Sequence, residues 1–268
     1  MATRSPKRHI LVACEESQAV TQALRDLGHY AYSCDLLPCS GGHPEWHFMM
    51  DVFDVIKSPK TCSLQNGKLM KAATGWNGEW EMMIAHPPCT YLAVSGAQWY
   101  YDPRDRDLPT SKRGPHPKYP NRLKDRAAAI RFFKKLARVP IARIVIENPV
   151  GVMSSRFCKP SQIVQPFWFG DEARKTTCLW LKNVPPLKPT NKVGEGERVY
   201  FKSGKSQPKW YSDAFVHAKS PEERRTMRSK TFPGMAKAMA EQWVNCFDCH
   251  PCVPNHRWEL AATGKLAI

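Results

Sequence analysis

The sequence predicts an α/β protein with a mostly parallel, doubly wound sheet, and two observations support this prediction. The first is a strand–helix–strand unit near the N-terminus: "HILVAC" is apolar, "EESQAVTQALRDLG" repeats apolar residues at helical spacing until Gly28, and "YAYSCDL" is apolar again. The second is a set of three later apolar runs, at 80–85, 142–149 and 174–182, two of which end at prolines. Strands that alternate with helices indicate a parallel sheet covered on both faces.

The rest of the chain divides by composition. Residues 121–139 form an amphipathic helix pattern, and residues 230–244 predict a helix that packs back on the sheet. Residues 97–121 are rich in Pro, Arg, Lys and Tyr without an apolar period, which predicts a long mobile loop. We therefore expect a catalytic domain over 1–184, a small lobe over 185–228 with only short strands such as "RVYF", a returning helix over 229–245, and a Cys-rich tail over 246–268.

Length and composition indicate a globular intracellular protein. A chain of 268 residues with 42% hydrophobic content can bury a large core, and it has no run of roughly 20 apolar residues that could span a bilayer. The basic N-terminus leads directly into a strand pattern without a cleavage site, so we expect a cytoplasmic protein with no membrane association. The ten cysteines are scattered, which favours reduced thiols.

The charge balance favours a polyanionic partner. Forty Lys and Arg against 24 Asp and Glu give a formal net charge of +16, concentrated in 104–143 and 182–230. A solvated basic surface would explain the charge alone equally well. Aromatic side chains are interleaved with the basic ones in "QWYYDPRDR" and "VYFKSGKSQPKWY", and this mixture is typical of contacts to phosphates and bases.

Two strand ends carry residues suited to one reaction. Cys89 follows two prolines just past the 80–85 strand, and Glu147 and Asn148 end the 142–149 strand, so parallel strands would bring them to the same sheet edge. A thiolate can add to carbon 6 of cytosine while an acid supports ring nitrogen 3, which makes carbon 5 nucleophilic. The alternatives are a buried structural thiol for Cys89 and a surface acid for Glu147.

At these motifs the sequence resembles the DNA cytosine-5 methyltransferase family, in particular its small phage-borne members. "PPCTYLAVSGAQ" has the Pro-Cys pair, the Ser-Gly pair and the following Gln of the nucleophile motif, and "IENP" stands at the Glu-Asn-Val motif. The resemblance covers most of 9–245. It implies that Cys89 is the nucleophile, that Glu147 contacts ring nitrogen 3 and that Asn148 positions the Pro-Cys loop. It also implies that Arg174, or else Lys175, contacts the cytosine carbonyl.

The resemblance further implies a Rossmann-like, S-adenosylmethionine-dependent methyltransferase fold with a small inserted target-recognition lobe. S-adenosylmethionine would be the methyl donor, no metal would be required for catalysis, and the target base would be flipped out of its duplex. The implied donor-binding residues are Ala13, Cys14, Glu15, Glu16, Ser17, Asp35, Asp51 and Pro87. Asp54 is an alternative to Asp51, and a capping or loop role is the alternative for Asp35. The family's glycine-rich first motif reads "ACEESQ" here, without glycine, and "KTFPGMAKAMAEQW" replaces its last motif.

Double-stranded DNA is the partner that charge and resemblance both favour, bound by a monomer. The expected contacts are Ser95, Gln98, Arg104, Lys112, Arg113, Lys202, Lys205 and Lys209. The 97–121 loop is either a lid over the flipped base or a flexible insertion, and the lobe would read base edges of a short sequence. A place in restriction–modification is one biological role that such an enzyme has.

Other patterns in the sequence allow further interpretations. "CFDCHPCVPNH" places Cys246, Cys249, Cys252 and His256 near metal-ligand spacing, with a reduced tail as the alternative. A zinc deaminase, suggested by His43 and Glu45, fails because Leu92 stands where a second thiol ligand is needed. The remaining functional alternatives are a DNA-binding relative without donor binding and an enzyme that alkylates carbon 5 of free pyrimidine nucleotides.

Overall fold

A central sheet with helices on both faces organises the protein in the computed structural model, which describes residues 6–247 and 256–263. The sheet has seven strands in the order β3-β2-β1-β4-β5-β7-β6, and β7 alone runs antiparallel to its two neighbours. The strands of this sheet are β1 (His9–Ala13), β2 (Tyr30–Asp35), β3 (His47–Met49), β4 (Met82–Ala85), β5 (Arg143–Pro149), β6 (Gln162–Val164) and β7 (Thr177–Lys182). The predicted α/β class with a mostly parallel sheet is confirmed.

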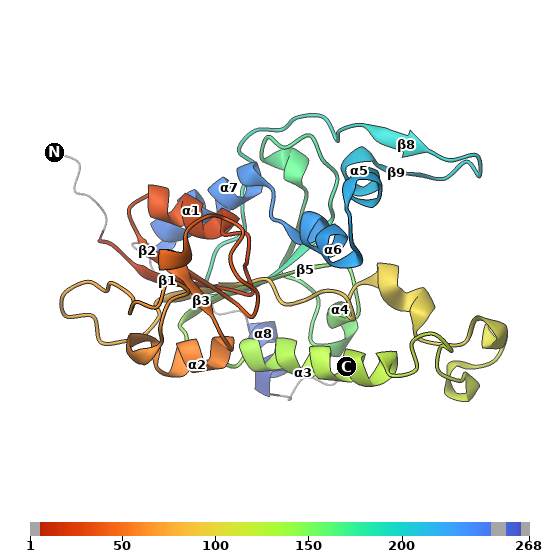
Figure 1. The fold of residues 1–268 in the computed structure, drawn as a ribbon, viewed down its shortest axis with the longest axis horizontal. Helices are drawn as coiled ribbons and strands as arrows, with labels where there is room; N and C mark the ends of the chain where they lie inside the picture. The colour runs from red at the N-terminus through yellow and green to blue at the C-terminus, as the bar shows by residue number, and fades with distance from the viewer. Residues whose placement is uncertain (1–5, 248–255, 264–268) are drawn as a thin grey trace.

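Helices cover the sheet in two layers: α1 and α7 lie on one face, and α2, α3 and α8 lie on the other (Figure 1). The α-helices are α1 (Ala19–Asp26), α2 (Val52–Lys57), α3 (Arg122–Leu136), α4 (Met153–Arg156), α5 (Lys209–His217), α6 (Pro221–Ser229), α7 (Pro233–Val244) and α8 (His256–Thr263). Short 3-10 segments lie at η1 (Pro44–Trp46), η2 (Pro59–Thr61), η3 (Val94–Trp99), η4 (Pro103–Asp105), η5 (Thr110–Lys112), η6 (Pro166–Trp168) and η7 (Asn245–Phe247). In the described part of the chain, no helix is long and apolar enough to cross a membrane.

The strands are apolar on both sides because both faces of the sheet are covered. In β1, Ile10 and Val12 belong to the core under α1 and α7, whereas Leu11 and Ala13 belong to the core on the opposite face. All five residues of this strand are buried, as expected for a central parallel strand. The core is therefore two apolar layers that share one sheet.

The strand order reverses between β1 and β4, so the carboxyl ends of these two strands form the switch point of the sheet. In an open α/β sheet, ligands bind where neighbouring connections leave for opposite faces. Ala13 is in register with Ala85, so the loop after β1 and the loop after β4 begin side by side. Ala85 is in register with Ile146, so His86 and Glu147 follow at the same edge.

The lobe over 185–228 has more regular structure than the sequence predicted. It contains the antiparallel hairpin of β8 (Arg198–Tyr200) and β9 (Ser206–Pro208), followed by α5 and α6, so the expectation of short strands alone was wrong. The Ser220 hydroxyl accepts a hydrogen bond from the Glu223 N–H and caps α6. In Figure 1 this hairpin and the 97–121 loop project on the same side of the molecule.

The 97–121 loop is attached to the domain near its two ends and contains the short 3-10 segments η4 and η5 and part of η3. The guanidinium of Arg122 donates to the Thr90 carbonyl at 3.0 Å and lies over the rings of Tyr91 and Tyr100. Tyr100 is buried, and its hydroxyl donates to the Tyr91 carbonyl. These contacts attach the ends of the loop to the segment that follows Cys89, while most residues of 103–121 are exposed. The predicted mobility of this loop stays a prediction.

The end of the chain contributes to the core. Helix α8 lies within the segment predicted to be a Cys-rich tail, and its Trp258 is only 1% exposed. The indole contacts Phe157 edge-on, with ring centroids 5.4 Å apart. A buried aromatic side chain of this size contributes several kcal/mol, so α8 is a structural part of the domain.

Candidate active site

Cys89 lies in a turn directly after β4. Its carbonyl accepts hydrogen bonds from the N–H groups of Leu92 and Ala93, both at 2.9 Å, and its side chain is partly buried. Burial raises the pKa of the Cys89 thiol and the carboxylate of Glu147 raises it further, while the cations of Lys175 and Arg228 act in the opposite direction. Cys89 is therefore mainly a thiol in the free protein, with two cations nearby that favour its thiolate.

Glu147 is the buried acid of the site. It lies on β5 with 8% of its surface exposed, and its Oε2 is 3.3 Å from His86 Nδ1. Burial alone would raise the pKa of Glu147, but the His86 hydrogen bond and the charge of Lys175 outweigh it, so the pKa lies below its usual value. The group is a carboxylate in the free protein. His86 was not among the predicted site residues.

Asn148 holds the Pro-Cys loop in place. Its Nδ2 donates a 2.7 Å hydrogen bond to the carbonyl of Pro87, and only 2% of the residue is exposed. Side chains alternate along a strand, so Asn148 faces the opposite side of β5 from Glu147. The contact is the one that the sequence resemblance implied for this residue, and it joins β5 to the loop that carries Cys89.

The basic residue near the pair is Lys175 instead of Arg174. The guanidinium of Arg174 is half-exposed and pairs with Glu195 at 3.0 Å, and Arg174 is not among the cations that act on the Cys89 thiol. The ammonium group of Lys175 interacts electrostatically with both Cys89 and Glu147, and it donates to the Lys230 carbonyl at 3.1 Å. The structure thus differs from the expected assignment of Arg174 to the cytosine contact.

The loop after β1 reproduces a glycine-type backbone without glycine. Cys14 and Gln18 both have φ of 58°, in the left-handed region that glycine adopts most readily. The Gln18 side chain is fully buried and donates to Ser33 Oγ at 3.1 Å and to the His43 carbonyl at 2.9 Å. Left-handed residues held by buried side chains are a common feature of ligand-binding loops.

Acidic groups from three strand ends meet beside this loop. Burial raises the pKa of the Cys14 thiol well above its usual value, and the carboxylates of Asp35 and Asp51 raise it further, which places the three groups close together. Asp35 is partly buried and interacts with Glu16, whereas Asp51 is exposed and caps α2 through the Phe53 N–H. The loop after β1 therefore lies beside carboxylates that attract cations.

Some of the expected donor-binding residues have structural roles. Glu15 is buried, and its carboxylate accepts hydrogen bonds from the Val20 N–H and the Thr21 hydroxyl, each at 2.7 Å. Both of its oxygens therefore already have partners at the start of α1. Ala13 is completely buried in the sheet. Glu16 and Ser17 are partly exposed, Asp54 is exposed in the first turn of α2, and the buried Pro87 accepts the Asn148 hydrogen bond.

The expected DNA contacts differ in availability. Arg104 forms a close ion pair with Asp102, Arg113 donates to the Leu108 and Arg106 carbonyls, and Lys209 pairs with Asp213. The side chains that are exposed and have no ion pair within the described residues belong to Ser95, Gln98, Lys112, Lys202 and Lys205. These five are the ones free to meet a partner.

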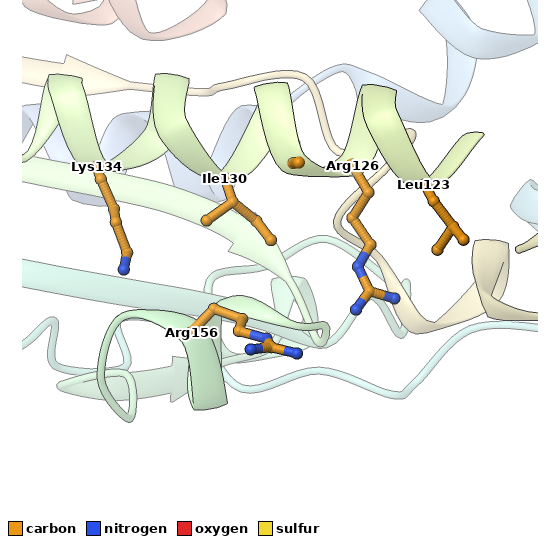
Figure 2. Close-up of a pocket in the computed structure, with 6 residues that line it drawn as sticks. Leu123, Arg126, Ile130, Lys134 and Arg156 are labelled. Carbon is orange, nitrogen blue, oxygen red and sulfur yellow. The ribbon is translucent and has the colours of Figure 1, made fainter. Parts of the chain in front are cut away.

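A second basic region lies at a cavity between α3 and α4, shown in Figure 2. Arg126 and Lys134 reach it from α3, and Arg156 reaches it from α4, while the remaining lining is apolar. None of the described residues that line this cavity is a nucleophile or an acid. Its cations fit an anionic group.

The metal-site hypothesis rests largely on residues outside the described ranges. Cys249 and Cys252 lie in 248–255, and the side chain of His256 is likewise not described. Cys246 is buried, and its thiol donates to the Trp243 carbonyl at 2.8 Å. Within residues 6–247 and 256–263, no group of three potential metal ligands comes together.

No protein-family model matches the chain, and no curated protein is significantly similar to it. Fold and site define the class of protein: an α/β protein whose mostly parallel sheet carries a thiol, a buried carboxylate and, beside the loop after β1, two further carboxylates along one edge.

Proposed function

We propose that the protein is an S-adenosylmethionine-dependent DNA methyltransferase that modifies carbon 5 of cytosine. The observation that carries the proposal is the position of Cys89 and Glu147 at one sheet edge, next to the point where the strand order reverses. The hydrogen bond from Asn148 to the Pro87 carbonyl attaches the loop that carries Cys89 to β5, the strand of Glu147. A nucleophile and an acid that face one ring are what cytosine activation requires.

The proposed reaction begins at the thiolate of Cys89. Its sulfur forms a bond to carbon 6 of a flipped-out cytosine while ring nitrogen 3 takes up a proton from the Glu147 side, which gives a neutral enamine that is nucleophilic at carbon 5. Lys175 and Arg228 favour the thiolate electrostatically. After carbon 5 receives a methyl group, a base or water removes its hydrogen and the carbon–sulfur bond breaks, which restores the thiolate.

The charges around the loop after β1 fit the donor. S-adenosylmethionine, when bound, supplies an electrophilic methyl group, and it carries a sulfonium and an ammonium cation. The carboxylates of Glu16, Asp35 and Asp51 around the Cys14 loop complement these cations, and Asp35 ends β2, where an acid can accept hydrogen bonds from ribose hydroxyls. This matching of charge supports the assignment of the loop after β1 to the donor.

Exposed basic side chains support duplex DNA as the partner. Lys202 and Lys205 lie on the β8–β9 hairpin, which projects on the same side as the 97–121 loop (Figure 1). Arg126, Lys134 and Arg156 add a further cationic region at the cavity in Figure 2. Exposed cations at several places on the surface suit contacts to the phosphates of a duplex.

The test is methyl transfer from a labelled donor to a random-sequence duplex library. We expect label in 5-methylcytosine with the wild type, no label with Cys89→Ala, and wild-type activity with Cys62→Ala, a matched thiol removal at a residue in the connection after α2. A Cys89→Ala variant as active as the wild type would refute the proposal.

One observation favours a second candidate, a DNA-binding relative that does not bind the donor. The loop over 13–18 has no glycine, although its backbone adopts glycine-type angles. Calorimetric titration with S-adenosylmethionine distinguishes the two candidates: binding that is weakened by Asp35→Asn supports the methyltransferase. DNA binding with no heat from the donor at high protein concentration supports the second candidate.

A further inference from the structure

The end of helix α6 lies against the candidate active site. The ammonium group of Lys175, just before β7, donates to the carbonyls of Ser229 at 3.4 Å and Lys230 at 3.1 Å. A cation at this place stabilises the carbonyl groups that are left unpaired at the carboxyl end of a helix. Figure 1 shows α6 at the same end of the sheet as α4, the helix that follows β5. The lobe therefore brings the last turn of α6, with Arg228, to the sheet edge that carries the site.

Aromatic rings of the lobe hold the Arg228 side chain. Its guanidinium carbon lies 4.1 Å from the ring centroid of Tyr211 and 5.5 Å from that of Phe215, both on α5. The guanidinium carbon of Arg224, one turn earlier on α6, lies 4.6 Å from the same Phe215 ring centroid. Stacking on an aromatic face orients a guanidinium without neutralising its charge. The group is thus preorganised, and its charge stays available to a ligand.

The charge of Arg228 has no counterion within residues 6–247 and 256–263. In these ranges its guanidinium makes no ion pair, and its buried Nε has no hydrogen-bond partner, although buried polar atoms nearly always have one. The neighbouring Arg225, by contrast, lies 3.9 Å from the carboxylate of Glu222. Arg228 as a whole is only partly buried, so an anion can approach its guanidinium from solvent.

The charge of Arg228 acts on the nucleophile of the site. Burial raises the pKa of the Cys89 thiol, and the positive charge of Arg228 opposes this rise. The groups that lower the pKa of Glu147 against the effect of burial are His86 and Lys175 instead. In cytosine, carbon 6 is bonded to the ring nitrogen that carries the sugar, and ring nitrogen 3 lies across the ring. A cation beside the sulfur that adds to carbon 6 therefore faces the sugar and phosphate of the target nucleotide.

We propose that Arg228 binds a backbone phosphate next to the target cytosine. This proposal rests on the proposed function. A guanidinium donates two parallel hydrogen bonds to phosphate oxygens, a geometry that the ammonium group of lysine does not provide. Every nucleotide carries a phosphate, so the contact positions the target without selecting the base. The lobe is then part of the catalytic pocket, because its last helix supplies one of the groups that hold the substrate.

The first test uses small probes and needs neither a duplex nor the donor. Iodoacetamide alkylates the Cys89 thiolate, and peptide mass spectrometry measures the rate in the presence of deoxycytidine, its 5′-monophosphate or its 3′-monophosphate. We expect one of the monophosphates to protect Cys89 at about 10-fold lower concentration than deoxycytidine does. Cys62, in the connection after α2, should be alkylated at the same rate with each probe. Protection of Cys89 that does not depend on the phosphate would overturn the proposal, as would no protection by any probe.

Two variants of α6 assign the effect to one residue. Arg228→Gln should abolish the preference for the monophosphate, whereas Arg225→Gln should retain it. Rates with and without the probe are compared within each protein, so a change in the reactivity of Cys89 itself cancels. Helix α6 has no buried residue, so both variants should fold, and their melting temperatures check this. A monophosphate preference that persists in Arg228→Gln would refute the role of Arg228.

Methyl transfer separates this proposal from the proposed function. With the random-sequence duplex library, we expect Arg228→Gln to lower kcat/KM about 10-fold and Arg225→Gln to leave it unchanged. A phosphate preference that Arg228→Gln removes, together with no methylation of any duplex by the wild type, would count against the methyltransferase while the phosphate site stands. Methylation by the wild type, together with a phosphate preference that Arg228→Gln does not change, would refute the phosphate site and leave the proposed function intact.

Discussion

The hydrogen bond from Asn148 to Pro87 allows a prediction that separates stability from activity. Asn148→Ala removes a 2.7 Å bond at a residue that is 2% exposed and leaves the Pro87 carbonyl without this donor. Loss of a buried partner costs about 1–3 kcal/mol of unfolding free energy. The melting temperature should fall by about 2–4 °C for each kcal/mol in a protein of this size.

The expected loss of activity is larger than the loss of stability explains. Without this hydrogen bond the Pro-Cys loop is free to shift, and a displacement of about 1 Å at a reacting group can cost about 10²-fold in rate. The variant should therefore be folded at 25 °C, bind duplex DNA normally, and transfer methyl groups about 10²-fold more slowly. Scanning fluorimetry and initial-rate assays on one preparation measure both effects.

A matched control is Asn245→Ala. Its Nδ2 also donates to a main-chain carbonyl at 2.7 Å, that of Glu241, but at the exposed end of α7. We expect little change in stability and none in activity. Asn148→Ala with the wild-type rate, or a rate loss fully restored by lowering the temperature, would refute a positioning role for Asn148.

Two further predictions concern acid stability and DNA binding. Burial opposes ionisation of Glu81, but hydrogen bonds from His9 and Arg8 lower its pKa from 4.5 to about 2. The stability that Glu81 contributes is complete above pH 4.5 and is lost as pH falls toward 2. The free energy of unfolding should therefore depend less on pH over this range in Glu81→Gln than in the wild type. Equal slopes of unfolding free energy against pH in the two proteins would contradict this. Lys202→Glu with Lys205→Glu should weaken binding to all duplexes, with a salt dependence reduced by about two counterions in fluorescence anisotropy titrations; an unchanged salt dependence would show that the hairpin does not contact phosphate.

The strands of the sheet were largely predictable because their signals are local. The observed β1 ends one residue before the predicted run, and β5 begins one residue after the start of its apolar segment. Proline at the ends of two runs and apolar residues on both faces are visible in the sequence without knowledge of partners. The fold class follows from these elements.

The helices of the lobe and tail were missed for identifiable reasons. Helix α6 has no buried residue, so its sequence shows no apolar face. At its start, however, "SPEE" has the serine, proline and glutamate that are typical of the beginning of a helix. That capping box alone predicts the start of this helix. Trp258 of α8 is buried by Phe157, about a hundred residues earlier in the chain, and no local pattern predicts such a contact.

The same distinction between local and distant signals applies to the site. Cys89 and Glu147 could be predicted because each belongs to a short motif. His86 contacts Glu147 only through the register of β4 and β5, and the choice between Arg174 and Lys175 depends on how the segment before β7 meets α6 and α7. Contacts between residues of different strands depend on how the elements pack, and neither motif predicts them.

The left-handed residues of the loop after β1 have a thermodynamic consequence for the ligand that binds there. A glycine-rich loop samples many conformations and loses that freedom when it closes on a ligand. Here the conformation is already fixed, since Gln18 bonds to Ser33 and His43, and Glu15 bonds to the start of α1. The ordering entropy is lost during folding, so association with the loop should proceed with little additional entropic cost and with little rearrangement of the protein.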